Sequence, residues 1–565
     1  MHEGDTNERP RDAGKLALHR VLCSDRVRLE LLEFGDSLVE PVERQINVER
    51  KHHMKLTICI LLVGTAFLGF AQNTALTTIE PGPLTVLPFY IGQPAKAHPL
   101  SPAGVPQNPF LAADAFSNVH NDGWMSDVYD IAGPLGKWPA LLSSTLQVAR
   151  QNEVPFFVCG TLTFDSRGRI VAICMGPKES SLVLVDPYTL QVLAYKKFNI
   201  APNPEAGYGN AYMYLDNRDR AVITQTDHVL VFEQTGPMDQ PQFNLLHDYN
   251  LSQWVGPNDN IQSVMPDWQG RLWLATRKSG FIGVFDPAAA TSGPVIPTLL
   301  GSLSLPEDPT LPREEISNSF AITENSAYVV TTKAMYRLTA GPDGTPRVVW
   351  RSKDYENINV RKPGQLSAGS GTSPTILGGG KYVAINDNAE QMHVVVYRTA
   401  ADLGPKEDRV VCEAPVFQKG TGATEDSIIG LDRSLIIANE YGNILNPLEP
   451  TSSPSVPGIA RVDIDPNGKG CWLVWTNYQV AAPQVGPKMS SKTGLIYFYT
   501  QKYDQNGLAV YYWTAVDFRT GAVVWEQQVG TGPRFNSFLP GPAIGPTGAL
   551  YVGLHDGIVS LRDTR

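Results

Sequence analysis

Short clusters of Asn, Asp, Glu and His recur along the chain and could bind a cation or a polar ligand. The clusters are residues 120–122, 209–210, 317–319, 386–388, 425–426, 439–440 and Asn536. Calcium takes about six to eight oxygen ligands in irregular geometry, and a bound cation can polarise an ester or lactone carbonyl. The candidate metal ligands are Asn318, Asp387, Glu425, Asp426 and Glu440, and the candidate ligand-binding residues are Asn210, Asn388, Asn439 and Asn536.

His120 and Asp122 are the candidate catalytic residues, because a histidine beside a carboxylate can act as a general base near neutral pH. The alternative is that His120 caps a turn. For each Asn and Asp of the clusters, the alternative is a strand or turn cap beside a water-filled tunnel. The chain has no Gly-x-Ser-x-Gly or His-Glu-x-x-His motif.

These clusters must be positioned by a repeat, a turn rich in Gly, Asp and Asn followed by a β-rich run. The clearest copies are residues 164–173, 215–224 and 266–275, and weaker copies centre on Ala327, Tyr382, Leu435, Leu495 and Leu550. The runs start about 51 to 60 residues apart, a period that predicts a β-propeller. We expect an all-β fold, a single propeller of eight four-stranded blades, with seven as the alternative. The clusters would then line an axial funnel where the innermost strands converge.

The last repeat ends at residues 557–561 without an outer strand. We expect a strand from residues 116 to 153 to supply it, because an open sheet edge would favour aggregation. The propeller would then span residues 116–565. Residues 72–115, rich in Pro and Ala, are expected to form an extended arm.

Residues 54–71 have the features of a secretory signal peptide: a positive start, an apolar stretch and small residues at its end. We expect a periplasmic or secreted protein with no membrane span after cleavage. Residues 1–53 are then a non-native extension, and the alternative is a cytoplasmic tail on an uncleaved signal anchor. Export permits disulfides. Cys159 with Cys174, and Cys412 with Cys471, could form bridges or remain as buried thiols.

The formal net charge is −10 and no run of Lys and Arg is present, which argues against a nucleic-acid partner. We expect a monomer that binds a small molecule.

The chain resembles a group of exported bacterial proteins with a quinoprotein-like or gluconolactonase-like propeller. The resemblance lies in residues 119–122 with Asp127, and in residues 131–136, 370–375, 386–388, 457–465 and 517–521, and it covers nearly everything after Pro106. Asp517, Gly521 and Trp525 match the docking repeat of pyrroloquinoline-quinone (PQQ) propellers, a structural signature. Asn318 is the match to a ligand Asn of the gluconolactonase family.

Three functions are consistent with these features. The first is an exported propeller that binds a small ligand or a metal at its axis without a firm activity. The second is a calcium-dependent lactonase or esterase. The third is a PQQ-dependent dehydrogenase, which we do not favour because the chain lacks the vicinal cysteines of many such enzymes and has one close copy of the docking repeat. Calcium is the expected cofactor.

Overall fold

The computed structural model describes residues 87–145, 158–175, 179–199, 212–287, 293–443, 455–482, 486–537, 541–555 and 557–564. The predicted signal peptide, the residues before it and Asn210 lie outside these ranges. All described residues belong to one compact unit, Leu76–Arg565. No helix in the described ranges has the length and apolar character needed to cross a membrane.

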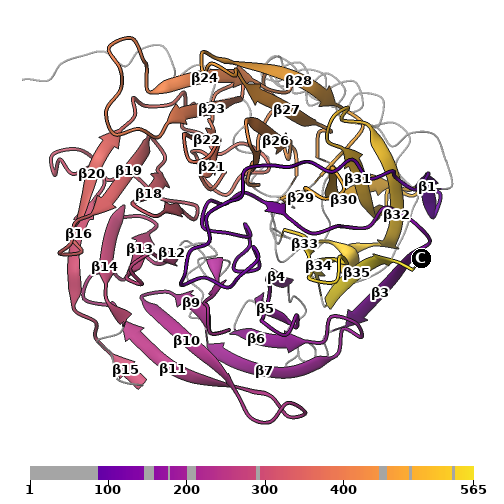
Figure 1. Cartoon of the computed structure of the whole chain (residues 1–565), viewed down its shortest axis with the longest axis horizontal. Helices are drawn as coiled ribbons and strands as arrows, with labels where there is room; N and C mark the ends of the chain where they lie inside the picture. The colour runs from indigo at the N-terminus through magenta and orange to yellow at the C-terminus, as the bar shows by residue number, and fades with distance from the viewer. Residues whose placement is uncertain are drawn as a thin grey trace, which may run out of the picture. The chain divides into compact units, whose positions relative to one another are not determined.

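The described strands form eight sheets arranged as blades in a ring (Figure 1). This confirms the predicted eight-bladed propeller. Blade 1 consists of β4 (Val158–Phe164), β5 (Ile170–Met175), β6 (Glu179–Val185) and β7 (Val192–Asn199), and blade 2 of β8 (Tyr214–Leu215), β9 (Ala221–Gln225), β10 (His228–Thr235) and β11 (Gln242–Asn250). Blade 3 consists of β12 (Ile261–Pro266), β13 (Leu272–Thr276), β14 (Phe281–Phe285) and β16 (Leu299–Ser304), and blade 4 of β17 (Ala321–Thr323), β18 (Ser326–Val330), β19 (Met335–Ala340) and β20 (Pro346–Arg351). A short strand, β15 (Gly293–Val295), adds to the outer edge of blade 2.

Blades 5 to 8 complete the ring. Blade 5 consists of β21 (Thr375–Leu377), β22 (Tyr382–Asn386), β23 (His393–Arg398) and β24 (Val410–Pro415), and blade 6 of β25 (Ile429–Leu431), β26 (Ser434–Ala438), β27 (Ile459–Ile464) and β28 (Cys471–Asn477). Blade 7 consists of β29 (Lys488–Ser490), β30 (Leu495–Tyr503), β31 (Ala509–Asp517) and β32 (Val523–Thr531), and blade 8 of β33 (Ala543–Ile544), β34 (Leu550–Leu554), β35 (Gly557–Asp563) and β3 (Pro139–Thr145).

Strand β3 closes the ring as expected from the sequence. It pairs antiparallel with β35 along its whole length, from Pro139 opposite Asp563 to Thr145 opposite Gly557. The N-terminal region therefore supplies the missing outer strand of the last blade. A second N-terminal strand, β1 (Tyr90–Gly92), pairs with β32 at the outer edge of blade 7.

The repeated turn joins the innermost strand of a blade to the second strand. In blade 1, Asp165 Oδ1 accepts hydrogen bonds from the backbone N–H groups of Arg167 and Arg169, and Arg169 Nε donates to Asp165 Oδ2 at 2.8 Å. The pairs Asp216 with Arg220 and Asp267 with Arg271 repeat this arrangement. Since an Asp side chain can bind the backbone two residues ahead, it stabilises the tight turn.

Burial decreases from the axis to the rim. Every residue of β12 and β26 is buried, because the inner part of each blade is covered by a blade on either side. On the outermost strand β28, Trp472, Leu473 and Val474 are exposed. The innermost strands are therefore the best fixed elements from which to present side chains to the axis.

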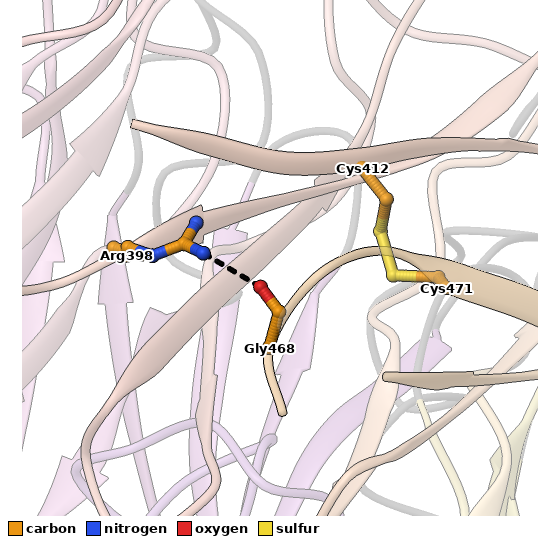
Figure 2. The surroundings of a disulfide bond; sticks show 4 residues. All are labelled: Arg398, Cys412, Gly468 and Cys471. Carbon is orange, nitrogen blue, oxygen red and sulfur yellow. Dashed lines mark hydrogen bonds between the residues drawn. A yellow bond between two sulfur atoms is a disulfide. The ribbon is translucent and has the colours of Figure 1, made fainter. Parts of the chain in front are cut away.

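Two disulfides are present, and both pairings considered from the sequence are formed. Cys159 and Cys174 face each other across β4 and β5 within blade 1. Cys412 and Cys471 join the outermost strands of blades 5 and 6, β24 and β28 (Figure 2). Close to this bridge, Arg398 Nη2 donates to the carbonyl of Gly468 at 2.6 Å, so blades 5 and 6 are linked both covalently and by a hydrogen bond.

The sequence did not predict what fills the centre of the ring. Figure 1 shows the indigo N-terminal chain running from β1 at the rim to the centre. There, residues 117–129, named here the axial segment, bind the innermost strands of successive blades. The backbone N–H groups of Ile322, Ile376, Gly430 and Met489 donate to the carbonyls of Gly123, Trp124, Ser126 and Asp127, respectively. The axial segment ends in β2 (Val128–Tyr129), which pairs parallel with β29.

Candidate functional site

A cavity lies on the axis at the starts of the innermost strands. Its volume is about 80 Å³, and each of the eight blades and the axial segment contribute to its lining. The lining residues are Val119, His120, Gly160, Thr161, Met175, Tyr212, Gln262, Arg277, Ser317, Asn318, Leu366, Glu425, Asp426, Ser427, Gly486, Lys488 and Gly541. We call this the axial cavity.

One side of the axial cavity is held by a buried ion pair. Lys488, the first residue of β29, places its ammonium against Asp127 of the axial segment and also donates to the carbonyl of Val119 at 2.5 Å. Ser427 Oγ donates to the other carboxylate oxygen of Asp127. Burial alone would raise the pKa of Asp127, but the charges of Lys488 and His120 outweigh it and lower the pKa. This arrangement fixes the axial segment to blades 6 and 7.

His120 lines the axial cavity, as predicted, but its carboxylate partner differs from the predicted one. His120 Nε2 lies 3.0 Å from Ser373 Oγ, and Nδ1 lies 3.6 Å from Asp127 Oδ2. Asp122 instead accepts hydrogen bonds from the backbone of Trp124 and from the hydroxyl of Ser126. Burial raises the pKa of Asp122 to about 6. Asp122, the neighbour in sequence, therefore stabilises the turn of the axial segment, whereas Asp127, seven positions after His120, faces the imidazole ring.

Three predicted carboxyl groups, those of Glu425, Asp426 and Glu440, gather at blade 6 beside the axial cavity. Glu425 Oε1 accepts a hydrogen bond from the backbone N–H of Leu366 at 2.7 Å, and Glu440 Oε2 accepts one from the backbone N–H of Glu425 at 2.9 Å. Burial raises the pKa of Glu425 to about 8. Burial and the neighbouring Asp426 raise the pKa of Glu440 well above its usual range. The folded environment therefore favours the protonated form of both carboxyl groups.

Polar groups of blades 2 to 4 complete the lining. Tyr212 Oη lies 3.3 Å from Asn318 Oδ1, and Asn318 Nδ2 donates to the carbonyl of Ser370 at 2.9 Å. Burial and the nearby Glu425 raise the pKa of Tyr212 to about 12, so its hydroxyl remains protonated. Arg277, which directly follows β13, is 9% exposed and reaches the same cavity. Gln262 Nε2 donates to the carbonyl of Ser317 at 2.7 Å.

The other predicted site residues do not line the axial cavity. Asp387 is hydrogen-bonded through Oδ2 to His393 Nδ1 at 2.6 Å. Asn388 donates to Asn357 and to the carbonyl of Val360. Asn439 accepts from the backbone N–H of Ala423 and donates to the carbonyl of Thr421. The backbone carbonyl of Asn536 accepts a hydrogen bond from the N–H of His555.

The predicted calcium site does not fit the donors that are present. Of the five predicted ligands, the axial cavity brings together Asn318, Glu425 and Asp426, with Glu440 buried behind them, while Asp387 is engaged by His393. Across the described residues, no group of three or more His, Cys, Asp or Glu side chains is arranged to hold a metal ion.

A second, wider hollow lies at the other ends of the innermost strands. Its volume is about 730 Å³, and its lining includes Asp122, Ser126, Gly430 and Ser491 together with residues 100–108 of the predicted arm. The described part of the arm crosses these strand ends, since the backbone N–H groups of His98 and Leu100 donate to the carbonyls of Thr493 and Ser491. His120 and Asp122 therefore contribute to different hollows.

Among the residues of the axial cavity that sequence reasoning missed are Tyr212, Gln262, Arg277, Ser427 and Lys488. Lys488 could have been found by counting back seven positions from the repeat centre Leu495 to the start of an innermost strand. Arg277 carried no such signal, because it follows the second strand of its blade, β13, and does not precede an innermost strand. Asp127 was noted for the resemblance and was not assigned a role.

Comparisons with known proteins leave the function open. No family model matches the chain. An uncharacterised protein of Archaeoglobus fulgidus is 32% identical over 276 residues, which are 44% of this chain and 52% of that protein. The chain thus matches about half of the length of this curated relative.

Solved structures with a similar fold include a virginiamycin B lyase from Staphylococcus aureus, at 11% identity and a TM-score of 0.36, over 65% of this chain and 98% of that one. A putative 6-phosphogluconolactonase from Bacteroides fragilis has 11% identity and a TM-score of 0.37, over 67% and 96%. The Dos1 propeller has 11% identity and a TM-score of 0.42, over 75% and 94%. Similarity this low says nothing about activity.

Proposed function

We propose that this protein binds a small molecule in the axial cavity. The observation that carries the proposal is the cavity itself: residues of all eight blades and of the axial segment converge on one space with charged and hydrogen-bonding groups. Concave sites with a few convergent polar groups and perturbed pKa values are the usual places for ligands. The axial segment forms a rigid part of the cavity wall, because Lys488 and Ser427 bind its Asp127.

Binding is favoured over hydrolysis by the position of Ser373, whose hydroxyl is hydrogen-bonded to His120 in the described part of the chain. Ser373 Oγ is hydrogen-bonded to His120 Nε2. However, Ser373 is 2% exposed and is not among the residues that line the axial cavity. A nucleophile must reach the substrate carbonyl within hydrogen-bonding range of its base. Ser373 therefore serves to orient His120.

The proposed site of action is outside the cytosol. The predicted signal peptide supports this, and so do the two disulfides, which persist in oxidising compartments.

A cavity-blocking variant tests the proposal. Gly541 lines the cavity, and a Cβ at this position would lie 3.4 Å from Lys488 Cε and 3.5 Å from Nζ, which is ordinary contact. Gly541→Leu should therefore fold and fill the cavity. The matched control is Gly256→Leu in an exposed loop, where an added Cβ meets nothing within 4 Å.

The measurement is thermal unfolding with acetate, lactate, acetamide, glycerol or ethylamine. We expect at least one probe to raise the melting temperature of the wild type and of Gly256→Leu, because a ligand of the folded state stabilises it. Gly541→Leu should show no such rise. A rise that persists in Gly541→Leu, or no rise with any probe, would contradict the proposal.

A further inference from the structure

Arg277 differs from the other buried cations near the axis. Its guanidinium makes no hydrogen bond and no ion pair with any side chain or carbonyl in the described ranges, although the residue is only 9% exposed. Lys488 is paired with Asp127, and Lys362 donates to two carbonyls, those of Ala389 and Gly422. None of its nitrogens is among the fully enclosed polar atoms that lack a partner in the described residues, so they face the open space of the axial cavity. The guanidinium therefore offers N–H donors to a ligand in this cavity.

We propose that the ligand of the axial cavity is a small carboxylate, held through its carboxylate group by the guanidinium of Arg277. This inference rests on the proposed function and names its ligand class. The planar guanidinium offers two parallel N–H donors that match the two oxygens of a carboxylate.

The groups around Arg277 suit such a ligand. Ser317 Oγ and Gln262 Oε1 are buried and have no hydrogen-bond partner in the described part of the chain, and both residues line the cavity. The Ser317 hydroxyl can donate to a carboxylate, while Gln262 Oε1 can accept from a ligand hydroxyl. Glu425 forms no ion pair with Arg277 within the described ranges, and its Oε1 accepts a hydrogen bond from the backbone N–H of Leu366 instead.

Size and lining favour a carboxylate over a phosphate ester. The volume of about 80 Å³ admits a molecule of a few heavy atoms, given that one water needs about 10–15 Å³ on the same measure. Val119, Met175 and Leu366 add an apolar part to the lining. A phosphate dianion would call for a second unpaired cation, and the other cation of the lining, Lys488, is already bound to Asp127.

The test uses calorimetric titration of the full chain at pH 7 with matched probes. Acetate and lactate are the carboxylates, acetamide and lactamide their neutral counterparts, and inorganic phosphate the competing anion. The variants are Arg277→Gln and Arg277→Lys, and the control is Arg519→Gln, whose side chain is half exposed and pairs with Asp517 away from the cavity. Gly541→Leu reports whether binding occurs in the cavity.

We expect a carboxylate to bind the wild type and Arg519→Gln, and its amide to bind at least about tenfold more weakly, as expected for loss of a charge-assisted contact. Arg277→Gln should weaken carboxylate binding by a similar factor, and Arg277→Lys by less. If Arg277→Gln does not fold, the comparison of carboxylate with amide on the wild type decides. Equal binding of both, or tighter binding of phosphate, overturns the inference.

Failure of this inference is distinguishable from failure of the proposed function. A neutral probe that binds the wild type with no dependence on Arg277, and is blocked by Gly541→Leu, would overturn the carboxylate and keep the cavity. Carboxylate binding that Gly541→Leu leaves intact would overturn both.

Discussion

Two carboxyl groups beside the axial cavity have opposite electrostatic states. Asp127 is fully buried, yet Lys488 and His120 lower its pKa, so it is ionised and its charge is used to hold the axial segment. Glu425 is partly buried near Arg277 without an ion pair, and burial raises its pKa to about 8. Burial acts in the same direction on both, and only a directly bonded cation reverses it. The Asp127 side is thus a structural clamp, and the Glu425 side leaves Arg277 available to a ligand.

The largest expected effect comes from breaking the clamp. Lys488→Met leaves Asp127 buried without its cation and should lower the free energy of unfolding by about 3–5 kcal/mol. Adding Asp127→Asn should recover part of this loss, because Asn tolerates the positive φ of 57° at this position and carries no charge. Urea unfolding at pH 7 measures both.

The control for the clamp is Lys492→Met. Lys492 pairs with Asp130 at 2.8 Å but both side chains are at least half exposed, so the change should be under about 1 kcal/mol. Equal losses for the two lysine variants would show that the buried pair is no clamp. In the wild type, the stabilisation by Asp127 should also disappear as the pH falls below the ordinary aspartate pKa of 3.8, because its folded pKa is lowered.

The second prediction concerns Glu425, whose contribution to stability should decrease as the pH rises, whereas that of Asp127 should decrease as the pH falls. Its pKa is raised from 4.5 to about 8 on folding, so the folded chain binds a proton that the unfolded chain has lost between these values. The stability of the wild type should therefore fall as the pH rises from 5 to 8. Glu425→Gln cannot ionise and should be more stable than the wild type at pH 8 by about 1–3 kcal/mol, and less so at pH 5.

Unfolding curves at both pH values test this difference. Glu390→Gln, at an exposed carboxylate, is the control and should give the same small difference at pH 5 and pH 8. A Glu425→Gln difference that does not change with pH would mean that Glu425 is ionised in the folded protein, and Arg277 would then have a protein partner.

The smallest expected effect sharpens the role of His120. Ser373→Ala removes the hydroxyl that lies 3.0 Å from His120 Nε2 and should lower the free energy of unfolding by about 1–2 kcal/mol. Ser180→Ala is the matched control, because Ser180 Oγ is buried and has no hydrogen-bond partner within the described ranges. A loss no larger than that of Ser180→Ala would indicate that His120 does not depend on Ser373.

The fold was predictable because its signals are local. The Asp–Arg turns at Asp165, Asp216 and Asp267 are encoded within five residues, and their spacing sets the blade period. The closing strand β3 followed from the missing outer strand of the last blade. His120, Asn318, Glu425 and Asp426 were likewise identified as polar residues near the starts of innermost strands, and they do line the axial cavity.

The sequence alone predicted the propeller, the repeat period and the closure of the ring, with eight blades favoured over seven, because turns and strands depend on neighbouring residues and on a regular period. Only the tertiary structure decided which polar residues meet. Asp127 and Lys488 are 361 positions apart, and Asp122, two positions from His120, contributes to a different hollow. The axial segment is not part of a repeat and contacts several blades, so its contacts cannot be predicted from neighbouring residues or from the repeat period. Whether a carboxyl group there is ionised depends on a cation that may come from any blade of the ring.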